Sequence, residues 1–239
     1  MTMHRKNFSC HSCMNENCLI RKNIHEEAIW PYLEKKNTFP CQKDQQFILE
    51  GAPVNGLYFI QQGCVKVFKQ TASKESQIIR FSKDGEIVGH RGFGTNYVYD
   101  ISASALTDSI LCNFSSDVLI EMLHKAPPLM FDFMLFYADQ LQKSEANAKR
   151  FGQMSVREKV INGLLFIGQK FGQTDGFINI TLSRKDIADF AGISTDQVIR
   201  VISALKKENL LIAKGKRLGI PDAEKFAAQF RETQYFLEG

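Results

Sequence analysis

The chain has 239 residues, 44% of them hydrophobic, and a formal net charge of +4 at pH 7. A chain of this length can hold two domains, each with its own core. No stretch approaches the roughly eighteen unbroken apolar residues of a membrane span, and no secretory signal opens the sequence. We therefore expect a soluble, cytoplasmic protein with no membrane partner.

Residues 1–25 form a polar, cysteine-rich segment. Cys10, Cys13 and Cys18 follow the pattern C-x2-C-x4-C, and the whole chain has six cysteines. Because no signal peptide directs the chain to an oxidising compartment, free thiols or metal ligands are expected rather than disulfides. Thiolates at this spacing can wrap one metal centre, but both a four-iron cluster and a tetrahedral zinc need a fourth ligand.

Three further cysteines are candidates for the fourth ligand. Cys41 is expected in a polar loop, Cys64 in the strand CVKVF, and Cys112 in SILCNF at the end of the next domain. In the alternative interpretation Cys112 is a small buried hydrophobe and the first three thiols bind zinc or nothing. Histidines could also substitute as ligands, although a single histidine in a polar tail is usually solvated; these are His4, His11 and His25.

Residues 26–124 are predicted to be a domain built around a β-roll. From Phe39 to Phe114, short apolar and alternating runs such as GLYFI, CVKVF and QIIRF are separated by glycines and polar turns. Such spacing predicts a small antiparallel barrel or roll.

Residues 125–153 are predicted to be one long helix. Beyond Pro127 and Pro128, apolar residues step by four and three, as in the seam of a two-stranded coiled coil. The stripe could pack on the chain's own roll, but we favour a homodimer in which two copies of the helix meet along it. The predicted interface consists of Met130, Met134, Tyr137, Leu141, Ser144, Ala148 and Phe151.

Residues 182–217 spell two short helices, a glycine turn and a basic hairpin. Ser183 can cap the first helix, and Gly192 supplies the left-handed turn where that helix ends. Ser194 caps the second helix and forms a capping box with Gln197. The buried face of this second helix is predicted to contain Val198, Val201, Ile202 and Leu205.

The opposite face of the second helix is predicted to read DNA. Arg200 can bind guanine at two points, Asp196 can accept from a cytosine amino group, and Ile199 could pack on a thymine methyl. This stretch contains eight basic and four acidic residues, and the excess of four equals the charge of the whole chain. An ordinary helical hairpin is the alternative, but the capping box, turn and basic hairpin together favour a DNA reader. The predicted DNA-binding residues are Ser194, Thr195, Asp196, Gln197, Ile199, Arg200, Lys214 and Lys216.

The helix-turn-helix with GISTDQVIRVISALKKENLL at its centre, followed by a wing, resembles the C-terminal domain of the CRP/FNR family of bacterial transcription regulators. The resemblance extends over most of the chain. It implies an α+β fold: an N-terminal antiparallel β-roll like the cyclic-nucleotide-binding jelly roll, a long dimerisation helix, and a winged helix-turn-helix in residues 154–239. It also implies a homodimer that binds palindromic double-stranded DNA and contacts RNA polymerase.

The segment DGEIVG, residues 84–89, resembles the glycine-bearing turn of the family's roll. In cyclic-nucleotide binders a glutamate follows this turn, and an arginine stands just before a Ser-Ala pair. Here His90 and Ile101 occupy those positions, and Arg91 is expected to be a surface charge. An anionic cyclic phosphate would lack its bidentate cation, which argues against cyclic AMP as a ligand.

The segment ALTDSILC, residues 105–112, is similar to the part of the FNR branch that carries the fourth cysteine ligand of its oxygen sensor. The resemblance implies a 4Fe-4S cluster on Cys10, Cys13, Cys18 and Cys112, and sensing of oxygen or redox state. The second cysteine gap has four residues here, whereas the familiar FNR spacing has five.

Asp196 and Arg200 stand where the family places an acidic residue and an arginine, which implies half-sites containing TTG.

Two other functions are weighed against this one. The first is a CRP-like regulator with a small-molecule effector in the roll and structural cysteines, either zinc-bound or free. The second is a zinc-dependent adaptor or an enzyme. No GxSxG, HExxH or phosphate-binding loop occurs in the sequence, so we do not expect an enzyme.

Overall fold

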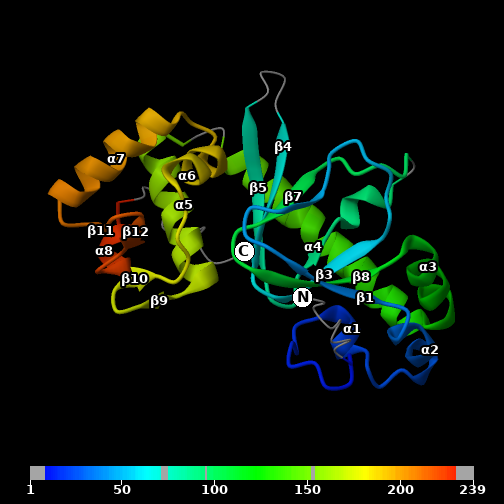
Figure 1. The fold of residues 1–239 in the computed structure, drawn as a ribbon. Helices are drawn as coiled ribbons and strands as arrows, with labels where there is room; N and C mark the ends of the chain where they lie inside the picture. Colours follow the sequence, from blue (N-terminus) through cyan, green and yellow to red (C-terminus); the bar gives the residue numbers. More distant parts are fainter. Residues whose placement is uncertain (1–8, 71–74, 95, 152–153, 230–239) are drawn as a thin grey trace. The chain divides into compact units, whose positions relative to one another are not determined.

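The computed structural model (Figure 1) describes residues 9–70, 75–94, 96–151 and 154–229, without the side chains of residues 147–151. The chain forms two compact units, residues 1–138 and 139–239, and each is described here by itself. Among the described helices, none combines the length and the apolar character that crossing a membrane requires.

The first unit is built around two four-stranded antiparallel sheets, with strand orders β1-β8-β3-β6 and β2-β7-β4-β5. The predicted antiparallel roll is thereby confirmed. Its strands are β1 (Asn37–Cys41), β2 (Gln46–Ile48), β3 (Leu57–Gln62), β4 (Cys64–Gln70), β5 (Ser76–Lys83), β6 (Ile87–Val88), β7 (Ser102–Ala105) and β8 (Ser109–Phe114).

The alternation of side chains along β3 and β8 produces two separate cores. Tyr58 and Leu111 point into the roll interior, where they pack with apolar residues of both sheets. Phe59 and Phe114 point to the outer side of the first sheet and pack against helices. The cysteine segment and several helices cover this outer side.

The helical cover comes from both ends of the unit. Before the roll lie α1 (Leu19–Lys22), the 3-10 turn η1 (Glu27–Ile29) and α2 (Trp30–Leu33). A second 3-10 turn, η2 (His90–Gly92), follows β6, and α3 (Ser116–Lys125) and α4 (Pro127–Phe151) follow β8. Helix α3 contacts both η1 and α2. Leu129 and Phe133 of α4 are buried in this outer core, so one face of the long helix packs on its own roll.

The second unit contains the predicted winged helix-turn-helix. Its elements are α5 (Val156–Phe171), β9 (Gln173–Thr174), β10 (Phe177–Ile178), α6 (Arg184–Ala191), α7 (Thr195–Lys207), β11 (Ile212–Lys214), β12 (Arg217–Gly219) and α8 (Ala223–Ala227). Ser183 and Ser194 both form capping boxes, and Gly192 adopts the left-handed conformation with φ of 62°. The local signals in the sequence therefore fix where these two helices begin and where α6 ends.

A second hairpin, β9–β10, was not predicted from the sequence and lies against the wing hairpin β11–β12. A Cβ added at Gly219 would overlap the backbone oxygen of Gly176. The Arg217 guanidinium also lies over the Phe177 ring, 4.7 Å from its centroid. The two hairpins therefore pack closely because one contact position has no side chain.

Candidate metal centre and nucleic-acid interface

The cysteine segment is fastened to strand β3 by side-chain hydrogen bonds. The Asn15 amide donates to the backbone oxygen of Ile60 at 3.4 Å and also to that of Gln61. Arg21 Nε donates to the backbone oxygen of Cys13 at 3.1 Å. These bonds tie the loop to the roll on one side and to α1 on the other.

A glycine lets the segment approach the roll closely. Gly85 has a φ of +82°, and a Cβ there would lie 3.2 Å from the backbone nitrogen of Cys18. That φ favours glycine, and the short distance leaves little space for a side chain. The position of Cys18 therefore depends on the turn before β6.

Cys112 faces the cysteine segment from strand β8. It packs against the same outer core as Cys10 and Cys18. Its sulfur lies 3.7 Å from Thr38 Oγ1 and 3.7 Å from Gln61 Oε1. Strand alternation thus places this fourth cysteine on the side of the sheet that the N-terminal loop covers.

The other two candidate cysteines lie elsewhere in the roll. The expectation of a polar loop at Cys41 is wrong, because Cys41 ends β1 and is only 1% exposed, facing the roll interior. Cys64 begins β4 in the other sheet. Among the histidines, His11 packs edge-on against Trp30, His25 lies 3.4 Å from Glu26, and His4 lies outside the described residues.

The four thiols of the predicted metal site influence one another. Burial raises the pKa of Cys10, that of Cys18 to about 12 and that of Cys112 to about 11. Negative charge on Cys10 or Cys13 raises the pKa values of Cys18 and Cys112 further. The three thiols with raised pKa values are therefore protonated at neutral pH when nothing is bound.

The donor set fits an iron-sulfur cluster. Within the described part of the chain, no three His, Cys, Asp or Glu side chains converge as they would around one metal ion. A four-iron cluster attaches each thiolate to a different iron, so its ligands need not meet at a single point. Four cysteine sulfurs from a loop and a facing strand are ligands of the required kind.

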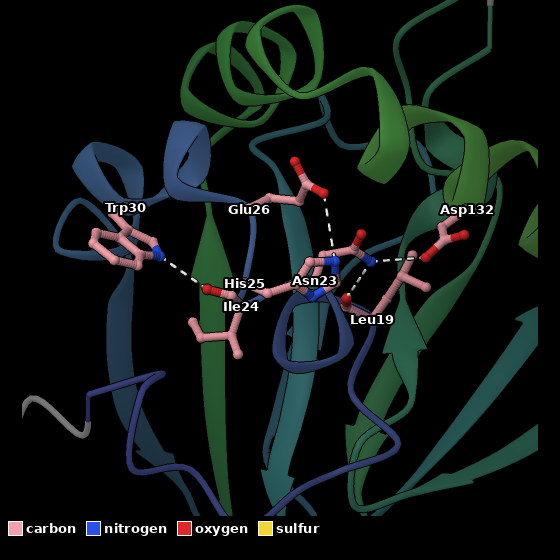
Figure 2. A network of polar contacts seen from close by, with 7 residues as sticks. All are labelled: Leu19, Asn23, Ile24, His25, Glu26, Trp30 and Asp132. Atoms are coloured by element: carbon pink, nitrogen blue, oxygen red, sulfur yellow. Dashed lines mark hydrogen bonds and ion pairs between the residues drawn. The ribbon is translucent and has the colours of Figure 1, made fainter.

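The cysteine segment is also tied to the long helix (Figure 2). The Asn23 amide, which ends α1 and is 3% exposed, donates to the backbone oxygen of Leu19 at 3.1 Å and to Asp132 Oδ2 at 2.8 Å. Nearby, Trp30 Nε1 donates to the backbone oxygen of Ile24 at 2.8 Å. A buried amide thus joins the end of α1 directly to α4.

The turn η2, which follows β6, contains a buried histidine. His90 is 4% exposed and packs edge-on against Phe136 and Tyr137, with ring centroids 5.0 and 5.6 Å away. Within the described residues, neither ring nitrogen has a hydrogen-bond partner. Burial lowers the pKa of His90 well below its usual value, and the charges of Arg80 and Arg91 lower it further. The imidazole is therefore neutral at physiological pH.

The recognition face of α7 is open to solvent. Ile199 is 46% exposed although it is apolar, and Asp196 and Arg200 beside it are exposed. Arg200 Nε makes a long hydrogen bond, 3.4 Å, to the backbone oxygen of Asp196. Ser194 and Gln197 bond to each other at the start of the helix. The remaining predicted contacts are Thr195, half-buried in the first turn of α7, and the exposed wing residues Lys214 and Lys216.

The outer face of α4 is apolar and exposed. Of the predicted interface residues, Met130, Met134, Tyr137 and Leu141 are exposed and Ser144 is half-buried. The side chains of Ala148 and Phe151 lie outside the described residues. The Tyr137 hydroxyl donates to the backbone oxygen of His90 at 2.7 Å, so Tyr137 also serves its own roll.

Several residues near these sites were not found by sequence reasoning. Phe131 and Leu135 of α4 are exposed beside the predicted stripe, and a wider apolar period could have indicated them. Asn23 and Asp132 are far apart in sequence, so no local pattern pairs them. Lys36 is buried at 5% exposure beside Cys10, although LEKKN reads as a solvated charge run.

Two family models match the chain. Residues 39–126 match the cyclic nucleotide-binding domain, and residues 158–229 match the Crp-like helix-turn-helix domain. The anaerobic regulatory protein of Pasteurella multocida is 24% identical over 220 residues, which cover 89% of this chain and 79% of that protein. The fumarate and nitrate reduction regulatory protein of Salmonella typhimurium is 24% identical over 232 residues, which cover 94% of this chain and 91% of that protein.

Solved structures share the fold. FixK2 from Bradyrhizobium japonicum has a TM-score of 0.73 at 19% identity, covering 82% of this chain and 98% of that one. The c-di-GMP responsive regulator CLP from Xanthomonas campestris has a TM-score of 0.72, with the same identity and coverage.

Proposed function

The chain belongs to the CRP/FNR family of DNA-binding transcription regulators, and we propose that it senses oxygen or redox state through a 4Fe-4S cluster. The family is one of regulators, not of enzymes, and its members bind DNA and act as dimers. Two of the relatives are named for anaerobic regulation and for fumarate and nitrate reduction, which supports a signal linked to oxygen. We place the protein in the cytoplasm.

The observation that carries this proposal is that Cys10, Cys18 and Cys112, from two distant parts of the chain, pack against one core cluster. Cys10, Cys13 and Cys18 would hold the cluster from the loop, and Cys112 would hold it from strand β8. The bound cluster supplies an oxygen-labile redox centre. Burial raises the pKa values of Cys18 and Cys112, so these two thiols would release their protons on binding iron.

The Asn23–Asp132 hydrogen bond offers a route from the cysteine segment to the dimerisation helix. If the segment shifts when its ligands are released, this bond and the packing of α1 change with it. The exposed apolar face of α4 suits a second copy of the chain in a parallel coiled coil. The state of the segment would then bias the dimer and the separation of its two recognition helices.

The recognition helix would read a palindrome whose half-sites contain TTG. Arg200 would bind the guanine, Asp196 would accept from a cytosine amino group and Ile199 would contact a thymine methyl. Lys214 and Lys216 in the wing would contact phosphates, which position the protein without reading sequence. Contact with RNA polymerase is general for the family, and we propose it here as well.

Iron and sulfide analysis of protein purified without air, together with its visible spectrum, tests the sensing proposal. Serine at any of Cys10, Cys13, Cys18 or Cys112 should abolish the iron chromophore, because each supplies one ligand. Serine at the matched controls Cys41 and Cys64 should preserve it. Equal loss at all six positions, or an intact chromophore in Cys112→Ser, would contradict the assignment.

His90 favours one alternative, a small-molecule effector in the roll. Buried polar atoms normally have partners, and both nitrogens of this imidazole lack one within the described residues. An uncharged ligand could fill that role while the cysteines stay structural. Anaerobic protein that binds DNA specifically but contains no iron would favour this alternative.

A further inference from the structure

Lys36 is a buried lysine beside the proposed ligands. Lysine is seldom buried without a partner because its ammonium is costly to remove from water. Lys36 is 5% exposed, and in the part of the chain that the structure describes no ion pair joins it to a carboxylate. Its charge instead acts on the Cys10 thiol, whose pKa it lowers against the larger effect of burial.

Lys36 directly precedes β1, the strand that pairs with the one carrying Cys112. Thr38, on β1, pairs with Cys112 across the sheet, and its hydroxyl contacts the cysteine sulfur. Lys36 lies two residues before Thr38, so in extended chain the two side chains share one face. The Lys36 charge also lowers the pKa values of both Cys10 and Cys112, against the larger effect of burial. The Lys36 charge thus acts on both the loop ligand and the strand ligand.

A buried ammonium suits the charge of the bound group. Four thiolates on a 4Fe-4S core leave roughly two negative charges on the whole centre. Placing that charge in a half-buried site is unfavourable unless a cation lies close by. Lys36 supplies such a cation. The spacing of the cysteines in the sequence does not predict a role for this lysine.

We propose that Lys36 is a positioning residue for the cluster: its buried ammonium, next to the strand whose Thr38 contacts Cys112, offsets the negative charge of the centre and so favours its retention by the thiols. This inference rests on the proposed iron-sulfur function. It predicts that the charge at position 36, rather than its volume, sets the reduction potential and the persistence of the centre.

The test compares Lys36→Met, which keeps the length but removes the charge, with Lys36→Arg, which restores a cation. The matched control is Lys35→Met. Lys35 is solvent-exposed, pairs with Glu121 at 3.9 Å and lies over the Tyr32 ring, so its removal changes the net charge equally without touching the thiols. For each protein we would measure iron content, reduction potential and the half-life of the visible absorption in air-saturated buffer.

Loss of the cation should disfavour the more negative, reduced centre. In Lys36→Met we expect about a tenfold fall in the ratio of reduced to oxidised cluster at fixed potential, which is about 59 mV for one electron. The chromophore half-life in air should also change several-fold. Lys36→Arg and Lys35→Met should stay close to wild type in both measurements.

The outcomes separate this inference from the function on which it rests. Wild-type protein without iron overturns both. Wild-type protein with iron, together with an unchanged potential and half-life in Lys36→Met, overturns only the role of Lys36. Lys36→Met could lose its iron altogether. In that case, iron retained by Lys36→Arg supports a role for the charge. Equal loss of iron in both variants shows that position 36 acts through packing and overturns the proposal.

Discussion

The hydrogen bond between Asn23 and Asp132 allows a quantitative test of how the cysteine segment is linked to α4. Asn23 is 3% exposed, and its amide donates to Leu19 and, at 2.8 Å, to the Asp132 carboxylate. Asp132→Ala would leave a buried N–H without its charged acceptor. A bond to a charged group contributes about 1.5–3 kcal/mol, and an unsatisfied buried donor costs a similar amount. We therefore expect the free energy of unfolding to fall by about 2 kcal/mol.

A double-mutant cycle measures the interaction energy of the pair, for which we expect about 1–2 kcal/mol. It requires denaturant unfolding of wild type, Asn23→Ala, Asp132→Ala and the double variant. The matched control is Asp139→Ala, which removes another α4 carboxylate. Asp139 pairs with Lys143 at 3.1 Å in a partly exposed position, so its loss should change stability by less than about 0.5 kcal/mol.

A second measurement tests transmission. Anaerobic and air-exposed Asp132→Ala should differ less in DNA affinity than the two forms of wild type do. An interaction energy near zero would refute the energetic argument. An unchanged response of DNA binding to air, in a variant that has lost the bond, would refute the proposed route to α4.

Three further predictions concern the DNA-binding unit, the dimer and the roll. Arg200→Ala should weaken binding to the preferred site by about 1–3 kcal/mol and relax the guanine preference. Lys216→Ala should instead weaken binding to all sequences alike and lower the slope of log affinity against log salt concentration by about one. A binding-site selection in which Arg200→Ala keeps the guanine preference would show that another residue reads that base. Ser144→Leu should strengthen self-association, because it adds apolar area to the predicted α4 seam; an unchanged association constant in sedimentation would count against the seam. The pKa of His90 is lowered by burial and, to a smaller extent, by the charges of Arg80 and Arg91. Below pH 6.5 the unfolded chain therefore binds a proton that the folded chain does not. The free energy of unfolding should then fall on acidification by up to about 1.4 kcal/mol per pH unit. His90→Gln should reduce that slope in denaturant titrations at pH 7.5 and 5.5, and an identical slope in both proteins would contradict a buried neutral imidazole.

The helix-turn-helix was predictable residue by residue because its signals are local. Ser183, Gly192, Ser194 and Gln197 each act within four residues of their own position, through a cap or a left-handed turn. Period-two alternation likewise predicts the strands around the roll. These features depend on short-range chemistry, which a single sequence records directly.

The environment of the cysteines was less accessible, because it depends on strand register and on contacts between distant segments. Cys41 and Cys112 both lie in strands, and only the pairing of β1 with β8 shows that one faces the roll interior and the other the N-terminal loop. The burial of Lys36 and the pairing of Asn23 with Asp132 follow from the same long-range packing. Local sequence patterns cannot predict contacts between residues that are far apart in the chain.

The packing of the two small hairpins has a consequence for the entropy of DNA binding. Gly219 of β12 sits against the backbone of Gly176 and Arg217 lies over Phe177, so the second hairpin restrains the wing. Its backbone is therefore ordered before DNA arrives, and little freedom remains to be lost on association. A larger side chain at Gly219 would separate the hairpins without removing Lys214 or Lys216, and we expect weaker DNA binding because the freed wing must then be immobilised in the complex.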